Sequence, residues 1–348
     1  MTRTTTSPDC PAQRPPLPAG RTTAKHLAER LGVATSTITR AFDKDSRISD
    51  ALRERILGLA QEVGYTPNAL ARSLNRRKTG IIALVMGGMS NPFYPALLEA
   101  LSLKLRQTGR QLLLFVVPPG GDADALTPQL LQYQVDGIVV TAARLSSHMS
   151  TLCGHQGVPV VFVNRRVEAA NVWSVCCDNQ RMGMAVAEYL MTRNRRACAF
   201  VSGDPGISTT SDRLRGFEEG LALHGLRLVA CAPGGYTFDG GREAAAHLFA
   251  AGQPAVDAVF CANDLMALGV LSYLRLNTSL RVPEDVAVVG FDDIDDAARP
   301  ENDLTTVHQP VAEMVDCAIR LLDEGPPNGS LDEALREVSG WLVPRSSA

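Results

Sequence analysis

The chain has 348 residues, of which 45% are hydrophobic and 20% are charged. This length is too great for one small domain and suits two or three, and the composition is that of a globular protein. No apolar run approaches the ~20 residues that span a bilayer, so we expect no membrane-spanning helix.

Charge is distributed unevenly along the chain. The formal net charge is −3, yet residues 1–80 contain 14 Lys and Arg against 7 Asp and Glu, whereas the remainder contains 20 against 30. A basic N-terminal segment joined to an acidic body is typical of a tethered nucleic-acid-binding module.

Residues 1–20 contain five prolines and no apolar run. We predict a disordered N-terminal tail there and no secretory signal peptide of the usual form. The eight cysteines form no C-x-x-C pair, and most of them fall in apolar runs. They indicate reduced core residues of a cytoplasmic protein rather than a zinc site or a disulfide framework.

Residues 21–65 are predicted to form an all-α helix-turn-helix head. The stretch TAKHLAERLGVATSTITRAF, residues 23–42, predicts a helix, a tight turn and a second helix. Thr23 is placed to cap the first helix and Gly32 to end it in the left-handed conformation. After a polar loop, Ser49 is predicted to cap a third helix.

The second of these helices carries short hydrogen-bonding side chains and one cation, namely Thr35, Ser36, Thr37, Thr39 and Arg40. Such side chains suit contacts to base edges and phosphates when the helix lies in the major groove. A plainer alternative is a helical hairpin with a polar outer face.

Residues 66–79 predict a short hinge helix or linker. Pro67 suits a first helical turn, Leu70 and Leu74 lie four residues apart, and basic residues surround them. A helix of about two turns is marginal alone, so we expect it to form when two copies pack over DNA and a leucine wedges between base pairs. A charged linker is the alternative.

Residues 80–346 alternate apolar β-branched runs with helical patterns. The runs are IIALVM, QLLLFVV, DGIVVT, VPVVFVN, ACAFVSG, AVFCAN and VAVVGF, and the helical patterns cover roughly 92–109, 125–134, 179–194, 211–224, 240–252, 264–276 and 310–323. This alternation predicts parallel sheets covered on both faces. The length favours two doubly wound lobes.

Ligands of such folds bind at the carboxyl ends of the strands. Amides, carboxylates, a guanidinium and aromatic rings follow the predicted strands here, which suits a small polyhydroxylated ligand. Each residue also has a plainer interpretation, because Asp264 can be a helix N-cap and Phe93 can be core. Their shared position at the strand ends is what favours a site.

From about Thr23 to Pro310 the sequence resembles the lactose-repressor (LacI/GalR) family of bacterial transcription regulators. AERLGVATSTITRAF resembles the family's helix-turn-helix and GYTPNALARSL its hinge helix. The segments SNPFY, VDGIVV, DRLRGF, ANDLMALG, VAVVGFDD and LTTVHQP occur in the order found in family effector domains. The family usually has Ser at the position of Ala34, so Thr35 is the candidate replacement cap.

The resemblance implies two lobes of periplasmic-binding-protein-like type and assigns residues to two sites. The implied DNA-binding residues are Thr35, Ser36, Thr37, Thr39, Arg40, Asn68, Ala71 and Leu74. The implied effector-binding residues are Phe93, Tyr94, Arg213, Tyr236, Asn263 and Asp292.

These observations predict a cytoplasmic, homodimeric transcriptional repressor that binds double-stranded operator DNA and senses a sugar or sugar acid. We expect no cofactor, no metal, no catalytic residue and no membrane partner. Two alternatives stay open: a solute-binding protein of a transport system, and an enzyme holding Mg²⁺ on Asp292, Asp293, Asp295 and Asp296.

Overall fold

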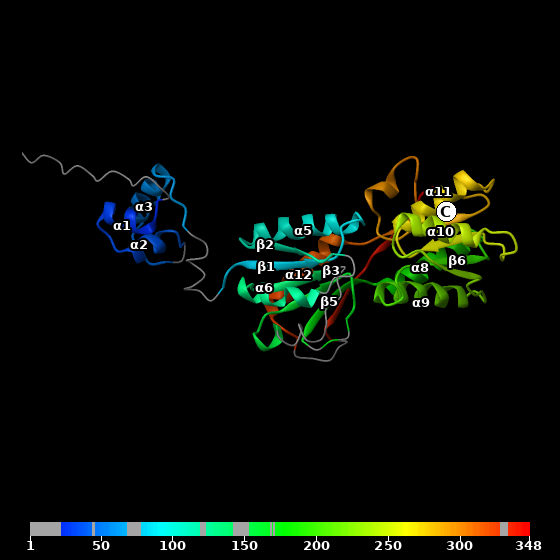
Figure 1. The fold of residues 1–348 in the computed structure, drawn as a ribbon, viewed down its shortest axis with the longest axis horizontal. Helices are drawn as coiled ribbons and strands as arrows, with labels where there is room; N and C mark the ends of the chain where they lie inside the picture. Colours follow the sequence, from blue (N-terminus) through cyan, green and yellow to red (C-terminus); the bar gives the residue numbers. More distant parts are fainter. Residues whose placement is uncertain are drawn as a thin grey trace, which may run out of the picture. The chain divides into compact units, whose positions relative to one another are not determined.

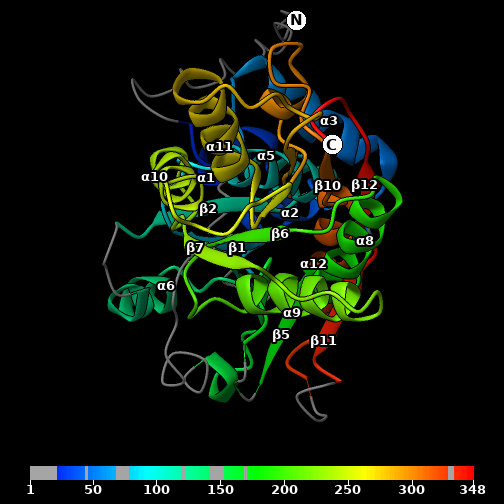
Figure 2. The same ribbon diagram turned by 90° about the vertical axis from the view of Figure 1, so that its right-hand side faces the viewer.

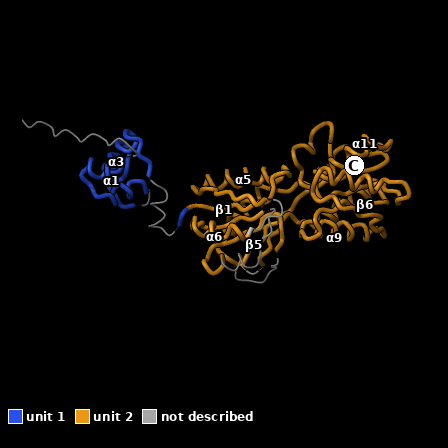
Figure 3. Tube along the Cα trace, viewed as in Figure 1, with its two compact units in different colours: residues 1–79 blue, residues 80–348 orange. Residues whose placement is uncertain are grey.

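The computed structural model describes residues 22–43, 46–67, 78–118, 123–141, 153–167, 169, 171–327 and 333–348. The chain divides into two compact units, residues 1–79 and residues 80–348 (Figure 3). The predicted tail, residues 1–20, and most of the predicted hinge helix lie outside the described residues. Among the described residues, no helix combines the length and the apolar character needed to cross a membrane.

The first unit contains three helices, α1 (Ala24–Leu31), α2 (Thr35–Ala41) and α3 (Asp50–Glu62) (Figure 1). Their shared core consists of Leu27, Ala28, Ile38, Ala41, Ile56, Leu59 and Ala60. The Thr23 side chain caps α1 in a capping box with His26, and Gly32 ends α1 at a φ of 66°. Both predicted boundaries of α1 are therefore confirmed.

The predicted caps of the next two helices need correction. Ala34 holds the N-cap position of α2 in extended conformation and makes no side-chain cap hydrogen bond. Thr35 is already helical, and its carbonyl accepts a hydrogen bond from the Thr39 hydroxyl. The expectation that Thr35 replaces the missing cap was therefore wrong. Ser49 does occupy the N-cap position of α3, but its side chain makes no cap hydrogen bond.

The second unit contains two parallel sheets, each at the centre of one lobe (Figure 1). The first has the order β11-β5-β4-β3-β1-β2 and comprises β1 (Ile81–Met86), β2 (Gln111–Val116), β3 (Gly137–Thr141), β4 (Val160–Val163), β5 (Val172–Cys177) and β11 (Leu335–Val338). The second has the order β7-β6-β8-β9 and comprises β6 (Cys198–Ser202), β7 (Ala230–Pro233), β8 (Ala258–Cys261) and β9 (Ala287–Val289). A small antiparallel pair, β10 (Thr306–His308) and β12 (Trp341–Val343), accompanies them.

Helices cover the sheets as the alternating pattern predicts. The helices next to the first sheet are α5 (Phe93–Gln107), α6 (Thr127–Gln132), α12 (Val311–Glu324) and the short 3-10 helix η1 (Ala123–Leu126). Around the second sheet, α10 (Phe238–Leu248) and α11 (Asp264–Asn277) lie on one side of β6, and α8 (Asn179–Thr192) and α9 (Ser208–Ala222) lie on the other (Figures 1 and 2). The predicted fold class is confirmed.

Alternate residues of β1 belong to different core clusters, which shows that this sheet is buried on both faces. Ile82, Leu84 and Met86 pack with α5, whereas Ala83 and Val85 pack with a separate cluster that includes Leu130 of α6. Apolar residues at successive positions are what two covered faces require. The runs of β-branched residues in the sequence follow from this burial.

The two lobes are joined where the chain leaves β5 for α8, leaves β9 for α12, and leaves β11 for the C-terminal residues. The last of these segments ends in the second lobe, where the carbonyl of Ala348 accepts a hydrogen bond from the Tyr189 hydroxyl of α8. β10 and β12 lie along two of these connections and pair with each other. The strand ends of both sheets are thereby brought to the boundary between the lobes.

Candidate functional site

Arg213 of α9 is a deeply buried charged side chain at this boundary, with 1% of its surface exposed. Its Nε donates to Asn179 Oδ1 at 2.8 Å, and its Nη1 donates to the carbonyl of Ala262. The guanidinium lies 3.5 Å from the ring centroid of Phe291, a cation–π arrangement. Its position is therefore fixed by groups following β5, β8 and β9.

Asp292 follows β9 and faces Arg213, with 3.8 Å between Asp292 Oδ1 and Arg213 Nη1. Its carboxylate also accepts hydrogen bonds from Gln309 Nε2 at 2.7 Å and from Asn91 Nδ2 at 3.0 Å. The pKa of Asp292 is raised overall, because the effect of burial exceeds the lowering effects of Arg213 and the two amide donors. Since Asn91 follows β1 of the first lobe, this carboxylate connects the two lobes.

Tyr236 follows β7 with a φ of 62°, which non-glycine residues rarely adopt. Its hydroxyl lies 2.6 Å from Thr210 Oγ1 and 3.2 Å from Thr209 Oγ1, both on α9. Its ring fits against Gly203, where an added Cβ would lie 2.0 Å from a ring carbon. Gly203 is thus required for the observed place of Tyr236.

Asn263 rather than Asp264 is the N-cap of α11, since its Oδ1 accepts from the backbone N–H of Met266 at 3.0 Å. Asp264 lies in the first turn and is fully buried, with its carboxylate accepting from the N–H of Ile294 and from the Thr306 hydroxyl. Burial and the nearby Asp292 raise the pKa of Asp264 to about 7. The alternative interpretation of Asp264 as a cap was therefore wrong.

Phe93 and Tyr94 begin α5 on the first lobe, and their rings meet edge to face with centroids 5.4 Å apart. Phe93 is buried, as the plainer interpretation allowed, while Tyr94 is half-buried. Burial and the charge of Asp292 raise the pKa of Tyr94 to about 12. Tyr94 of the first lobe is thus close enough to Asp292 of the second lobe to respond to its charge.

Several buried polar atoms at these strand ends have no hydrogen-bond partner among the described residues. They include two donors, Arg213 Nη2 and Asn263 Nδ2, and two acceptors, Gln309 Oε1 and Asn164 Oδ1. Unpaired buried polar groups are costly and rare in folded proteins. A mixture of donors and acceptors is what sugar hydroxyl groups satisfy.

Sequence reasoning assigned no role to Asn91, Asn179 and Gln309, although each contacts Arg213 or Asp292. Asn91 and Gln309 stand within segments that carry the family resemblance, SNPFY and LTTVHQP. The available signal was their position directly after a predicted strand or before a helix. Their partners could not be deduced, because these contacts join segments that are far apart in sequence.

The acidic residues considered as a magnesium site are arranged differently. Asp293 binds Arg345 at 2.7 Å and His308 Nδ1 at 2.8 Å, and Asp296 pairs with Arg299. Within the described part of the chain, no group of three or more His, Cys, Asp or Glu side chains is placed to hold a metal ion.

In the first unit, α2 presents Thr35, Ser36 and Arg40 at the surface, while Thr37 and Thr39 are half-buried. Arg53 of α3 donates to backbone carbonyls of residues 41, 43 and 46 and so supports the end of α2. The other predicted DNA-binding residues, Asn68, Ala71 and Leu74, lie outside the described residues.

Family models match both units. Residues 23–68 match a model described as bacterial regulatory proteins, lacI family. Residues 79–322 match a model described as periplasmic binding proteins and sugar binding domain of LacI family.

Individual relatives agree with these matches. The transcriptional regulator CelR of Thermobifida fusca is 32% identical over 87% of this chain and 91% of its own length. The ribose operon repressor of Escherichia coli is 29% identical over 94% of this chain and 99% of its own.

Two solved structures extend the comparison. A CelR–cellobiose complex has a TM-score of 0.68 at 28% identity, covering 94% of this chain and 100% of that one. A lac repressor dimer bound to operator and the anti-inducer ONPF has a TM-score of 0.82, covering 94% and 99%. At 21% identity the second likeness shows the fold alone.

Proposed function

The chain belongs to the LacI family of DNA-binding transcriptional regulators, and on that premise we propose that it represses transcription under the control of a sugar bound between its two lobes. The observation that carries the proposal is the meeting of Arg213 and Asp292 at the strand ends, surrounded by unpartnered buried donors and acceptors. Thr35, Ser36, Thr37, Thr39 and Arg40 of α2, with Asn68, Ala71 and Leu74, are the proposed DNA contacts.

We propose an uncharged sugar rather than a sugar acid as the effector. The positive charge of Arg213 faces the negative charge of Asp292 at 3.8 Å, so this pair leaves no excess charge for an ionised ligand. The free atoms Arg213 Nη2, Asn263 Nδ2 and Gln309 Oε1 offer hydrogen bonds to hydroxyls. Phe93, Tyr94 and Tyr236 supply aromatic surface for the sugar face.

Coupling to DNA requires that the ligand distinguishes between two arrangements of the lobes. Asp292 provides such a link, because it accepts from Asn91 of the first lobe and faces Arg213 of the second. A sugar hydroxyl that competes for this carboxylate alters the contact between the lobes. We propose that this change reaches the DNA-binding unit through residues 66–79.

The relatives also guide the remaining proposals. Regulators of this family act by binding, and we propose that this chain likewise has no catalytic role and works in the cytoplasm, where its DNA is. A homodimer matches the near-palindromic operator that a helix-turn-helix pair binds. Transport binding is disfavoured, because residues 23–68 match the regulatory-protein model.

The test replaces Asp292 by Asn in the full chain and measures operator binding by fluorescence anisotropy, with and without the sugar that binds the parent. The exchange keeps the shape but removes the charge facing Arg213. We expect loss of the sugar response and unchanged DNA binding in its absence. Asp239→Asn, an exposed site on α10, is the control for the charge change. A sugar response equal to that of the parent would refute the site.

A further inference from the structure

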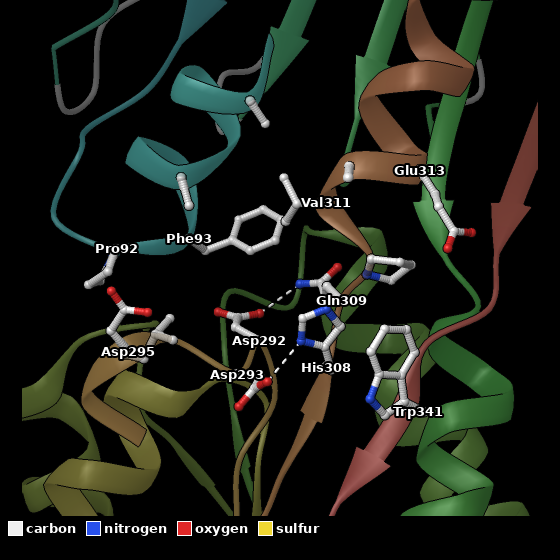
Figure 4. A pocket seen from close by; sticks show the side chains of 15 residues that line it. Pro92, Phe93, Asp292, Asp293, Asp295, His308, Gln309, Val311, Glu313 and Trp341 are labelled. Carbon is white, nitrogen blue, oxygen red and sulfur yellow. Dashed lines mark hydrogen bonds and ion pairs between the residues drawn. The ribbon is translucent and has the colours of Figure 1, made fainter. Parts of the chain in front are cut away.

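A cavity lies at the connections between the lobes (Figure 4). This hinge cavity encloses about 480 Å³ and is lined by Pro92, Phe93, Ala96, Ala100, Asp292, Asp293, Ile294, Asp295, His308, Gln309, Pro310, Val311, Ala312, Glu313 and Trp341. Tyr94, Arg213, Tyr236 and Asn263 do not line it, whereas Asp292 does. Phe93 and Gln309 line it as well, so three residues of the proposed sugar site are shared with this cavity.

Much of the hinge cavity is apolar. The start of α5 contributes Phe93, Ala96 and Ala100, and the start of α12 contributes Val311 and Ala312, so the apolar surface comes from two neighbouring helices. The alanines leave room between these helices for a compact hydrocarbon group. Burial of such a group removes its apolar surface from water, which favours binding.

One side of the cavity is aromatic. The Trp341 indole stacks on the His308 ring with centroids 4.2 Å apart and an interplanar angle of 25°. Half of the Trp341 surface remains exposed, and Figure 4 shows the ring at the edge of the cavity near Glu313. An exposed indole face attracts cations through its quadrupole.

The charges around the cavity do not balance. Asp292 faces Arg213, and Asp293 is paired with Arg345. Asp295 and Glu313 are exposed, and neither makes an ion pair with the described residues. The lining thus has an excess of negative charge, which disfavours an anion and favours a cation.

Acidic residues near helix starts are common, because they interact favourably with the helix dipole. That effect accounts for Glu313 in the first turn of α12, but not for Gln309. Gln309 lines the cavity with no exposed surface, and its Oε1 has no hydrogen-bond partner among the described residues. An unsatisfied acceptor in the same cavity as the unpaired carboxylate of Glu313 calls for a donor-rich ligand.

We propose that the hinge cavity binds a small organic cation, a protonated amine carried on a compact apolar body. The body occupies the space between α5 and α12, and the ammonium group faces Glu313 and the Trp341 ring, at the end of the cavity opposite Asp295. Because the lining comes from both lobes, the ligand influences the arrangement that the effector also controls. The site goes beyond the sugar-binding function and can exist whether or not that function is correct.

The chain offers a direct reporter, since it has only two tryptophans and Trp173 is buried. In a Trp173→Phe full-length variant, Trp341 is the sole source of indole fluorescence. The probes are cyclohexylmethylamine, cyclohexylmethanol and cyclohexanecarboxylate at neutral pH, which share a ring and differ in charge. We expect saturable changes with the ammonium at roughly tenfold lower concentration than with the alcohol, and none with the carboxylate.

Glu313→Gln should weaken the ammonium response by about two- to fivefold. Asp295→Asn, at the opposite end of the cavity, and Glu188→Gln, an exposed control on α8, should leave it nearly unchanged. Equal affinity for amine and alcohol would overturn the proposal, as would the absence of saturation. If the indole does not respond and its emission is already that of a buried tryptophan, a second copy of the chain covers the cavity. This result would also overturn the proposal. If Trp173→Phe does not fold, calorimetry of the parent with the same probes decides. Operator binding and sugar response, measured separately, test the effector site.

Discussion

The contact between Gly203 and Tyr236 gives the sharpest structural prediction. A Cβ at residue 203 would lie 2.0, 2.2 and 2.6 Å from three carbons of the Tyr236 ring. Ordinary carbon contacts begin near about 3.5 Å, so Gly203→Ala must displace the ring by more than about 1 Å. The ring then loses its hydroxyl contacts to Thr209 and Thr210.

The magnitude follows from these losses. Overpacking costs about 1–3 kcal/mol, and the two hydrogen bonds contribute about 1 kcal/mol each, so we expect Gly203→Ala to reduce the free energy of unfolding by roughly 3–5 kcal/mol. In a Tyr236→Ala background the ring is absent, and the same substitution should cost less than about 1 kcal/mol. Gly88→Ala is the control, because its added Cβ would meet nothing within 4 Å.

Chemical denaturation of the four variants of this cycle, monitored by circular dichroism, measures the coupling between the two residues. An equal cost of Gly203→Ala in both backgrounds would refute the reasoning, because the penalty would then come from the backbone rather than from Tyr236. Once the sugar is identified, the Gly203→Ala variant should bind it at least tenfold more weakly, a loss of about 1.4 kcal/mol of binding free energy.

Three further predictions concern other residues. Arg40→Ala should weaken operator binding by about 1–3 kcal/mol if Arg40 contacts a base bidentately. Unchanged affinity, measured by anisotropy, would show that α2 is not the helix that enters the groove. Leu74→Ala should reduce operator affinity but spare binding to random DNA, and equal losses would make Leu74 a packing residue. Asp264 has a pKa raised to about 7, so its ionisation in the unfolded chain destabilises the fold progressively as pH rises from about 4 to about 7. The thermal midpoint should therefore fall between about pH 4 and pH 7, and less so in Asp264→Asn; identical slopes in this range would contradict the raised pKa.

The sequence was most informative where local chemistry decides the structure. α1 begins after Thr23 and ends at Gly32, as predicted, because a side-chain cap and a left-handed glycine act within a few residues. The alternation of apolar strands with helices likewise predicted two doubly wound lobes. β11 and β12 were missed, because LREV and WLV are short and half-exposed and their pairing comes from distant partners.

The site was less predictable for the same reason. Arg213 and Asp292 could be placed near each other because both follow strand ends or helix starts in one lobe. Their supporting contacts to Asn91, Asn179 and Gln309 depend on how three connections cross the lobe boundary. No periodicity in the sequence specifies those crossings, so these partners emerge only from the folded chain.

The most direct test of the regulatory account is operator binding by the full chain in the presence of carbohydrates. DNA selected from a random library supplies the operator, and anisotropy is then measured with a panel that includes cellobiose and ribose. We expect one uncharged sugar to change operator affinity by roughly 5- to 150-fold, and Asp292→Asn to abolish that change while leaving sugar-free binding intact. Failure to select any specific DNA, or a sugar response that survives Asp292→Asn undiminished, would contradict the account.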